Sequence, residues 1–282
     1  MNLVIDSGGT KSNLAYLENG QILDVFTEPG LQLSRESVED FEKKVIRWSE
    51  FKPGPLDSVF LFAAGHLDRF KEQKLIEILN KTFGARHIEL HSDLLAACFA
   101  TAGLNKGIVG ILGTGSNSCY YDGETIVKNI SPGGFVLGDE GSGAYLGKQF
   151  LIDYLRNEMP HDIQQQLEQE LNLNPAMVIQ NIYGGSVRDA AWFCSGFAPF
   201  IITRLKDEYC LKLCTKSINE YLNLIEKNYI SYTNKLYLVG SIAFYLKDLI
   251  YEEAEKRNIE IIKIIQHPIN DLALYLSGKY RL

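Results

Sequence analysis

The most constraining feature of the sequence is an internal repeat. The segment GTKSNLAY at residues 9–16 returns as GTGSNSCY at residues 113–120, with five of eight positions identical at a constant offset of 104 residues. Each copy follows a short apolar stretch and precedes a second turn signal, Asn19-Gly20 in one case and Asp122-Gly123 in the other. A repeat of this kind is typical of a duplicated structural unit. We therefore expect two related lobes, at residues 1–104 and 105–282.

The pattern of apolar runs and turn residues predicts an α/β fold, with mixed sheets flanked by helices. The first 27 residues alternate short apolar runs with turns, which predicts three antiparallel strands. Strands and helices then alternate, as is typical of a parallel extension of the same sheet. The elements expected there are a helix ending near Trp48, a strand at 59–64, a helix at 68–83, a strand at 87–90 and a helix at 92–102. The second lobe is expected to carry a helical insertion at about 144–232, followed by a strand at 235–239, a helix at 241–256, a strand at 259–265 and a helix at 268–277.

The composition restricts the class of protein. With 282 residues, 46% hydrophobic and 22% charged, the chain suits about two globular domains. No apolar run approaches the ~18 residues of a membrane span, and the first residues do not resemble a signal peptide. A net charge of −7 disfavours nucleic acid and anionic lipid as partners. The five scattered cysteines are expected to be free thiols in a reducing cytoplasm. We therefore expect a cytoplasmic protein. The charge does not exclude a small anionic ligand held by backbone amides, and a homodimer is left open.

Both copies of the repeat place glycines in a strand-turn-strand, which lets backbone amides point into the turn. Such turns can hold phosphate oxygens, with hydroxyl groups alongside. The residues concerned are Gly8, Gly9, Thr10 and Lys11 in one copy and Gly113, Thr114 and Gly115 in the other. One such turn alone is explained more simply as a tight hairpin. Two near-identical turns favour capture of a nucleotide's phosphates from two sides, by a fold other than that of the P-loop, whose sequence is absent.

Carboxylates follow or end several predicted elements. Asp6, at the end of the first strand, can hold Mg²⁺ through water, or can bond its own backbone as a turn former. Asp93 begins the helix after the strand at 87–90, where it can accept a proton from a bound hydroxyl or stabilise the helix start. That helix start is expected to keep Asp93 ionised, as a weak base available at neutral pH. Asp139, at another helix start, allows the same two interpretations.

Together, these segments resemble the BadF/BadG/BcrA/BcrD ATPase family, which includes the N-acetylglucosamine kinases and belongs to the superfamily of actin, sugar kinases and Hsp70. The matching segments, spread in the family's order over residues 3 to about 265, are DSGGT at 6–10, Asp93, GTGSN at 113–117, GDEGS at 138–142 and VGS at 239–241. The resemblance implies two actin-like (ribonuclease H-like) lobes with Mg²⁺ and ATP in a cleft between them. It implies a sugar kinase that transfers the γ-phosphate of ATP to a hydroxyl of an amino sugar or an N-acetylated hexosamine.

The resemblance also implies roles for individual residues. Asp93 would be the general base, Thr10 and Thr114 would contact phosphates, and Gly240 and Ser241 would contact adenosine. The sugar pocket would be lined by Ser116, Asn117, Gly133, Gly134 and Asp139. The family usually offers an asparagine to the amino sugar after the first three strands, where this chain has Gln32. Gln32 is expected to take that place, and the identity of the sugar is therefore open.

Two other functions remain as alternatives. The other branch of the family activates a partner enzyme and carries an iron–sulfur cluster on cysteines near this stretch, but residues 132–148 contain no cysteine. A non-catalytic ATP-binding regulator would keep the fold without transferring phosphate. The presence of Asp6, Asp93 and Asp139 argues against that second alternative.

Overall fold

A computed structural model of the chain describes residues 1–8, 11–31, 36–51, 54–65 and 69–280. The chain divides into two compact units, each of which is described by itself. The first unit comprises Met1–Asn105, Gly123–Thr125 and His267–Leu282, and the second comprises Lys106–Asp122 and Ile126–Gln266. The first boundary falls beside the expected one, after residue 104. The expected second lobe extended to residue 282, whereas the structure groups His267–Leu282 with the first unit.

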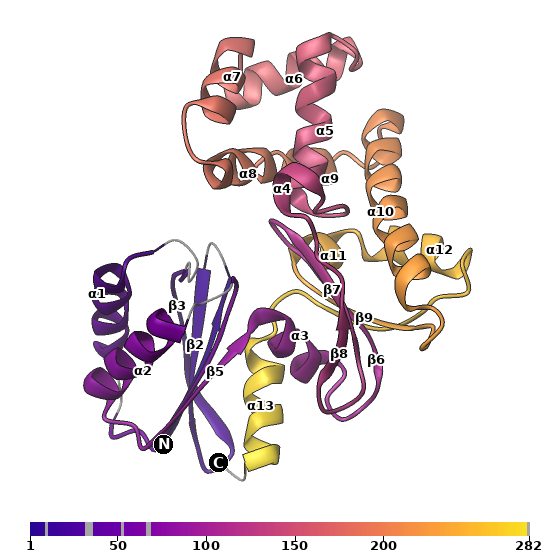
Figure 1. Ribbon diagram of the computed structural model, residues 1–282. Coiled ribbons are helices and arrows are strands. Elements are labelled where there is room, and N and C mark those ends of the chain that lie inside the picture. The colour runs from indigo at the N-terminus through magenta and orange to yellow at the C-terminus, as the bar shows by residue number, and fades with distance from the viewer. Residues whose placement is uncertain (9–10, 32–35, 52–53, 66–68, 281–282) are drawn as a thin grey trace. The chain divides into compact units, whose positions relative to one another are not determined.

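The first unit is built on a five-stranded mixed sheet (Figure 1). Its strands are β1 (Asn2–Ser7), β2 (Lys11–Glu18), β3 (Gln21–Pro29), β4 (Ser58–Ala63) and β5 (His87–Ser92). In the order β3-β2-β1-β4-β5, the first three strands are antiparallel, and β4 and β5 run parallel to β1. The expected antiparallel start and its parallel extension are both confirmed.

Helices cover both faces of this sheet. They are α1 (Val38–Ser49), α2 (Arg69–Phe83), α3 (Asp93–Thr101) and α13 (Ile269–Tyr280). Figure 1 shows α1 and α2 on one side of the sheet and α3 and α13 on the other. Ser37 is the N-cap of α1: its hydroxyl accepts the N–H of Asp40 over 3.2 Å. The buried face of α1 carries Phe41, Val45 and Trp48, which recur at helical spacing and join the core of this unit.

The position of α13 explains why the expected second lobe was too long. This helix packs against α3 and the strands β1, β2 and β3. The ring of Tyr275 stacks on that of Phe99 in α3, with centroids 4.7 Å apart. Leu272, Ala273 and Leu276 are buried. Hydrophobic periodicity identifies such an apolar face but not the surface that it covers, so the sequence did not assign α13 to the first unit.

The second unit has a sheet of the same topology. Its strands are β6 (Gly107–Leu112), β7 (Ser116–Tyr121), β8 (Ile126–Asn129), β9 (Lys235–Val239) and β10 (Glu260–Ile265). Their order, β10-β9-β6-β7-β8, pairs β6 antiparallel with β7 and parallel with β9, as β1 pairs with β2 and β4. Strand for strand, β6 to β10 therefore correspond to β1 to β5. The internal repeat marks a duplicated unit, as expected.

The two copies differ by one residue in the turn after the first strand. Ser7 pairs with Ser12 in the first unit, and Leu112 pairs with Ser116 in the second. Equivalent residues are thus 105 apart before the turn and 104 apart after it. The offset of 104 in the sequence belongs to the turns and the strands that follow them. By this register, the counterpart of Asp6 is Ile111.

Helices α4 to α10 lie between β8 and β9 in sequence and form the expected helical insertion. They are α4 (Gly134–Leu137), α5 (Gly143–Arg156), α6 (His161–Leu171), α7 (Pro175–Tyr183), α8 (Val187–Ser195), α9 (Ala198–Ile202) and α10 (Glu208–Tyr229). The helix expected at 241–256 is instead divided into α11 (Ser241–Tyr245) and α12 (Lys247–Glu255). The break falls at Leu246, a buried core residue whose backbone (φ −100°, ψ 16°) leaves the helical region.

Two further expectations concern the whole composition. All five cysteines lie within the described ranges, where each is buried and none forms a disulfide. Within the described ranges, no helix combines the length and the apolar character that a membrane crossing requires.

Candidate active site

Two carboxylates, those of Asp6 and Asp93, belong to one edge of the first unit's sheet. The parallel strands β1, β4 and β5 place Ser7, Ala63 and Ser92 side by side in register. Asp6 precedes that row by one residue, and Asp93 follows it by one residue. Both therefore lie at the carboxyl ends of the parallel strands, where open α/β sheets bind their ligands.

Burial raises the pKa of both carboxylates, and the charge of Asp93 adds to the effect on Asp6. Burial, followed by the negative charge of Asp93, raises the pKa of Asp6 to about 7. Burial also raises the pKa of Asp93, although its carboxylate accepts the N–H of Leu94 over 2.8 Å. This direction is opposite to the expected one. The cap of α3 is Ser92, whose hydroxyl accepts the N–H of Leu95, so Asp93 gains less from the helix start than it loses through desolvation.

The carboxylates at this edge suit a magnesium ion that arrives with a phosphate. A cation beside Asp6 would stabilise the ionised form that burial and Asp93 disfavour. In the described parts of the chain, no three His, Cys, Asp or Glu side chains are arranged to hold a metal. Magnesium commonly keeps several waters and binds through one or two carboxylates plus substrate phosphates. The residues present therefore fit Mg²⁺ held by Asp6 through water.

The raised pKa of Asp6 predicts a pH dependence of stability. Its carboxyl titrates near 3.8 in an unperturbed chain and near 7 in the folded protein, so the folded state binds more protons between these values. The contribution of Asp6 to the free energy of unfolding should therefore fall as the pH rises from about 4 to about 7. Asp6→Asn should gain stability over the wild type at about pH 7.5 but not at about pH 4.5. Urea denaturation at both pH values measures this, and an equal difference at both would contradict it.

The turn between β1 and β2 is described only at its two ends. The backbone N–H of Gly8 donates to the carbonyl of Lys11 over 2.9 Å, and Lys11 is exposed. Gly9, Thr10 and Gln32 lie outside the described residues. The buried hydroxyl of Ser7 lies 2.7 Å from that of Ser12 and accepts the N–H of Leu31 over 2.7 Å. These bonds join the base of the turn to the segment that follows β3.

The corresponding turn of the second unit, between β6 and β7, is fixed to the start of α5. The N–H of Gly113 donates to the carbonyl of Gly115 over 3.0 Å. The carbonyls of Gly113 and Thr114 accept the N–H groups of Gly143 and Ala144, over 2.8 and 3.0 Å. A Cβ built on Gly113 would meet no atom within 4 Å, so this side of the turn is open.

The side chain of Asp139 packs against the β6–β7 turn and forms a hydrogen bond with its last part. Its carboxylate accepts the N–H of Ser116 over 3.3 Å, and a Cβ on Gly115 would lie 3.1 Å from its Oδ2. Its backbone is in the left-handed region, at φ 60°, and burial raises the pKa of its carboxyl. Only 8% of Asp139 is exposed, and this residue lines neither of the cavities described next.

A cavity of about 420 Å³ opens beside the β6–β7 turn, and we name it the α9 cavity. Its lining residues are Gly113, Thr114, Gly143, Ser195, Ala198, Pro199, Ile202, Thr203, Ser241, Ile242 and Tyr245. Gly240 precedes Ser241 with φ 120°, and a Cβ there would lie 2.3 Å from the carbonyl oxygen of Leu112. A glycine is therefore required where β9 turns into α11 beside the cavity.

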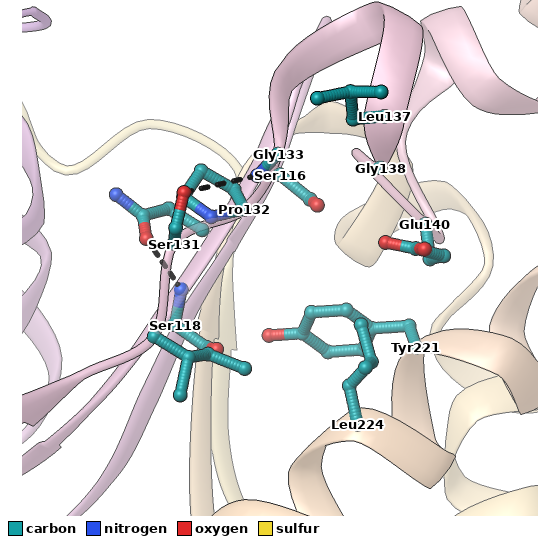
Figure 2. A pocket seen from close by; sticks show the side chains of 12 residues that line it. Ser116, Ser118, Ser131, Pro132, Gly133, Leu137, Gly138, Glu140, Tyr221 and Leu224 are labelled. Atoms are coloured by element: carbon teal, nitrogen blue, oxygen red, sulfur yellow. Dashed lines mark hydrogen bonds between the residues drawn. The ribbon is translucent and has the colours of Figure 1, made fainter.

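A second cavity of about 210 Å³ lies between β7, the segment before α4, and α10, and we name it the α10 cavity (Figure 2). Its lining residues are Ser116, Asn117, Ser118, Ile130, Ser131, Pro132, Gly133, Leu137, Gly138, Glu140, Tyr221 and Leu224. Figure 2 shows Glu140 and Tyr221 on the side opposite Ser118 and Ser131. The Tyr221 hydroxyl is buried and, among the described residues, finds no hydrogen-bond partner.

The structure brings together some of the residues singled out in the sequence and separates others. Gly113, Thr114 and Ser241 line the α9 cavity, and Ser116, Asn117 and Gly133 line the α10 cavity. Gly115, Gly134, Asp139 and Gly240 line neither. The sequence missed the α8 and α9 residues of the α9 cavity, which read as ordinary helix positions. It also missed Glu140 and Tyr221, although Glu140 stands inside the GDEGS segment.

A solved structure of a "putative N-acetylglucosamine kinase" from Porphyromonas gingivalis matches the chain from end to end. The two align with a TM-score of 0.91 and 30% sequence identity, over 99% of this chain and 100% of the other. The chain belongs to the N-acetylglucosamine kinase-like family of actin-like ATPases. The branch that the sequence motifs predicted is confirmed.

Two further relatives of this N-acetylglucosamine kinase-like protein differ in how much they match. The N-acetyl-D-glucosamine kinase of Dictyostelium discoideum is 31% identical over 173 residues, which are 54% of this chain and 53% of that protein. The match thus spans about half the length of that curated relative. A "putative N-acetylglucosamine kinase" from Chromobacterium violaceum shares the fold, with a TM-score of 0.71 and 18% identity over 98% of each chain. The chain matches no family model.

Proposed function

We propose that this protein is an ATP-dependent sugar kinase, which transfers the γ-phosphoryl group to a hydroxyl of an amino sugar or an N-acetylated hexosamine. The names of its relatives support this class of reaction. The observation that carries the proposal is the β6–β7 turn, whose open glycine, Gly113, faces a cavity large enough for a nucleoside.

The proposed nucleotide contacts of the second unit lie around the α9 cavity. At about 420 Å³, the α9 cavity lies in the range of small-molecule sites, which runs from roughly 300 to 1,000 Å³. Its apolar residues suit the faces of a base, and the Thr114 and Ser241 hydroxyls suit phosphate and ribose oxygens. The missing side chain at Gly113 allows a phosphate to approach the backbone of the turn. Gly115 and Gly240 shape this site, and Gly8, Gly9, Thr10 and Lys11 are proposed phosphate contacts of the first unit.

The proposed catalytic and metal-binding acids belong to the first unit. Asp93 accepts the proton of the sugar hydroxyl while the hydroxyl oxygen attacks phosphorus, and its raised pKa makes it a better proton acceptor than an ordinary aspartate once ionised. Asp6 holds Mg²⁺ through water. When bound, the ion neutralises phosphate charge, which together with positioning supplies most of the rate in phosphoryl transfer.

The α10 cavity is the proposed sugar side of the second unit. Ser116, Asn117 and Gly133 contact sugar hydroxyls from one wall. Tyr221 forms part of the opposite wall, with its hydroxyl buried against Gly110 of β6. Asp139 acts on the sugar through the backbone of Ser116, which it holds. Gly134 and Gln32 complete the proposed set.

A coupled assay of ADP release tests the function. The sugars to be screened are glucosamine, N-acetylglucosamine, N-acetylmannosamine, N-acetylmuramic acid and glucose, each with Mg²⁺ and ATP. We expect release that depends on one or more of the amino sugars and on Mg²⁺. Release that ignores the sugar would identify an ATPase instead, and binding of ATP without any turnover would identify a regulator. We further propose that this activity belongs to the cytoplasm, the compartment in which cysteines ordinarily stay reduced.

A further inference from the structure

We propose that the α9 cavity discriminates poorly among purine bases, so that ATP, ITP and GTP serve as phosphoryl donors with similar efficiency. This inference rests on the proposed function, because it concerns the donor nucleotide of the same reaction. It assigns the base specificity to the end of α8 and to α9, which no sequence motif marks.

The wall available to a base follows from the lining of the cavity. Gly113 and Thr114 belong to the β6–β7 turn, where the phosphates are proposed to bind. The remaining residues come from the start of α5, from α8 and α9, and from α11. The residues from the end of α8 to the position just after α9 are Ser195, Ala198, Pro199, Ile202 and Thr203. Three of these five are apolar, so contact with a base is mainly van der Waals contact with its faces and edges.

The hydroxyls of Ser195 and Thr203, the two in this wall, already donate hydrogen bonds to backbone carbonyls. That of Ser195 donates to the carbonyl of Trp192 over 2.8 Å. That of Thr203 donates to the carbonyl of Pro199, 2.8 Å away, with the carbonyl of Phe200 at 3.1 Å. A hydroxyl carries one hydrogen, so neither group has another to donate to a base. Pro199 has no backbone N–H, and the N–H of Thr203 donates to the carbonyl of Pro199 over 3.0 Å.

The lone pairs that remain on these hydroxyls do not separate one purine from another. An oxygen that only accepts can pair with the 6-amino group of adenine, with N1–H of hypoxanthine, or with N1–H and the 2-amino group of guanine. Among the described residues that line the cavity there is no charged side chain, and hence no carboxylate to select guanine. The side chains of this wall therefore offer no donor that would reject a 6-amino group, and no fixed acceptor pair that would reject a 6-oxo group. The cavity is also lined by the hydroxyls of Ser241 and Tyr245, and the latter accepts a hydrogen bond from Gln266 over 3.2 Å. A hydroxyl rotates and can either donate or accept, so neither of them selects one purine over another.

Physical limits on discrimination then set the expected size of the effect. A site rejects an analogue by roughly 10⁴–10⁵-fold only when the analogue leaves a buried polar group of the site unpaired. A mainly apolar pocket rejects a molecule of nearly the same shape by about 10² at most. Adenine and hypoxanthine have nearly the same shape, so the pair tests this wall most directly.

Calorimetric titration with ADP, IDP and GDP in the presence of Mg²⁺ tests the inference without requiring turnover. We expect dissociation constants for ADP and IDP within about tenfold of each other, and kcat/KM values for ATP and ITP to follow them. An IDP affinity more than about 10² below that of ADP would overturn the inference. Equal binding of the three diphosphates with no sugar phosphorylated would instead reject the proposed function and leave the inference about the base standing.

The variant Thr203→Val sharpens the test, because valine has the shape of threonine without its hydroxyl. Thr203 is exposed and directly follows α9, so the variant should fold. The ratio of the ADP and IDP dissociation constants should stay within about threefold of the wild-type ratio, whatever happens to each constant. A ratio that changes by tenfold or more would show that the Thr203 hydroxyl reads the 6-position, and would overturn the inference.

Discussion

Asp93→Asn should lower kcat by roughly 10²–10⁴-fold, the usual range for the loss of a positioned general base. Asparagine keeps the size of the side chain and can still accept the N–H of Leu94, but it does not take up the proton of the sugar hydroxyl. The start of α3 should persist, because Ser92 caps it. In the wild type, kcat should fall as the pH is lowered through the raised pKa of Asp93, since the protonated acid is no base. The residual activity of the variant should lack this dependence.

A second readout of Asp93→Asn does not depend on catalysis. The charge of Asp93 is one of the two causes that raise the pKa of Asp6, so the variant should lower the pKa of Asp6 below about 7. Carboxyl titration by nuclear magnetic resonance measures this shift. Asp162→Asn is the matched control, because Asp162 is also an acid in the first turn of a helix, α6, but is exposed and outside both cavities. If Asp93→Asn kept more than about a tenth of kcat, Asp93 would not be the base, and Asp139 would be tested next.

Gly113→Val should weaken binding of Mg²⁺ and ATP by roughly 10- to 100-fold. No atom lies within 4 Å of a Cβ at this position, and the backbone does not require glycine, so the variant should fold. The added methyl groups would occupy space beside the α9 cavity that the nucleotide is proposed to use. Overpacking of this kind typically costs about 1–3 kcal/mol, and each 1.4 kcal/mol is about tenfold in affinity. Isothermal titration calorimetry measures the change.

The control for Gly113→Val is Gly278→Val. Gly278 is exposed in α13, and a Cβ there also meets no atom within 4 Å, but this glycine lines neither cavity. Its substitution should leave the ATP affinity unchanged. Melting temperatures of both variants separate a loss of affinity from a loss of fold. An unchanged affinity in a folded Gly113→Val protein would remove the β6–β7 turn from the nucleotide site.

The arrangement of the strands could be predicted from the sequence, because turns and strand periodicity are local properties. Two copies of one turn motif sufficed to predict two equivalent sheets, and their strand orders do correspond. The partner of α13 was not within reach. Leu272, Ala273 and Leu276 form an apolar face that the sequence pattern identifies. The pattern does not indicate which surface of the protein that face packs against.

The candidate site was predicted unevenly for the same reason. Strand ends and glycine turns are readable, and they led to Asp6, Asp93 and Gly113. The α9 cavity depends on where α8 and α9 lie in space, and residues such as Ala198 and Ile202 have the character of ordinary helix residues. The pKa of Asp93 was expected in the wrong direction, because its position at a helix start is visible in the sequence and its burial is not.

The grouping of α13 with the first unit sets an order for the completion of the two units during synthesis. Ile269, at the start of α13, follows Thr101, at the end of α3, by 168 residues. At the usual rate of about 5–20 residues per second, a ribosome needs roughly 10–30 s to make that stretch. Until then, the surface of the first unit that α13 covers stays exposed to solvent on the nascent chain. The second unit, although its synthesis begins later, can complete its fold first. Chaperones that bind apolar surface therefore have their best opportunity on the first unit.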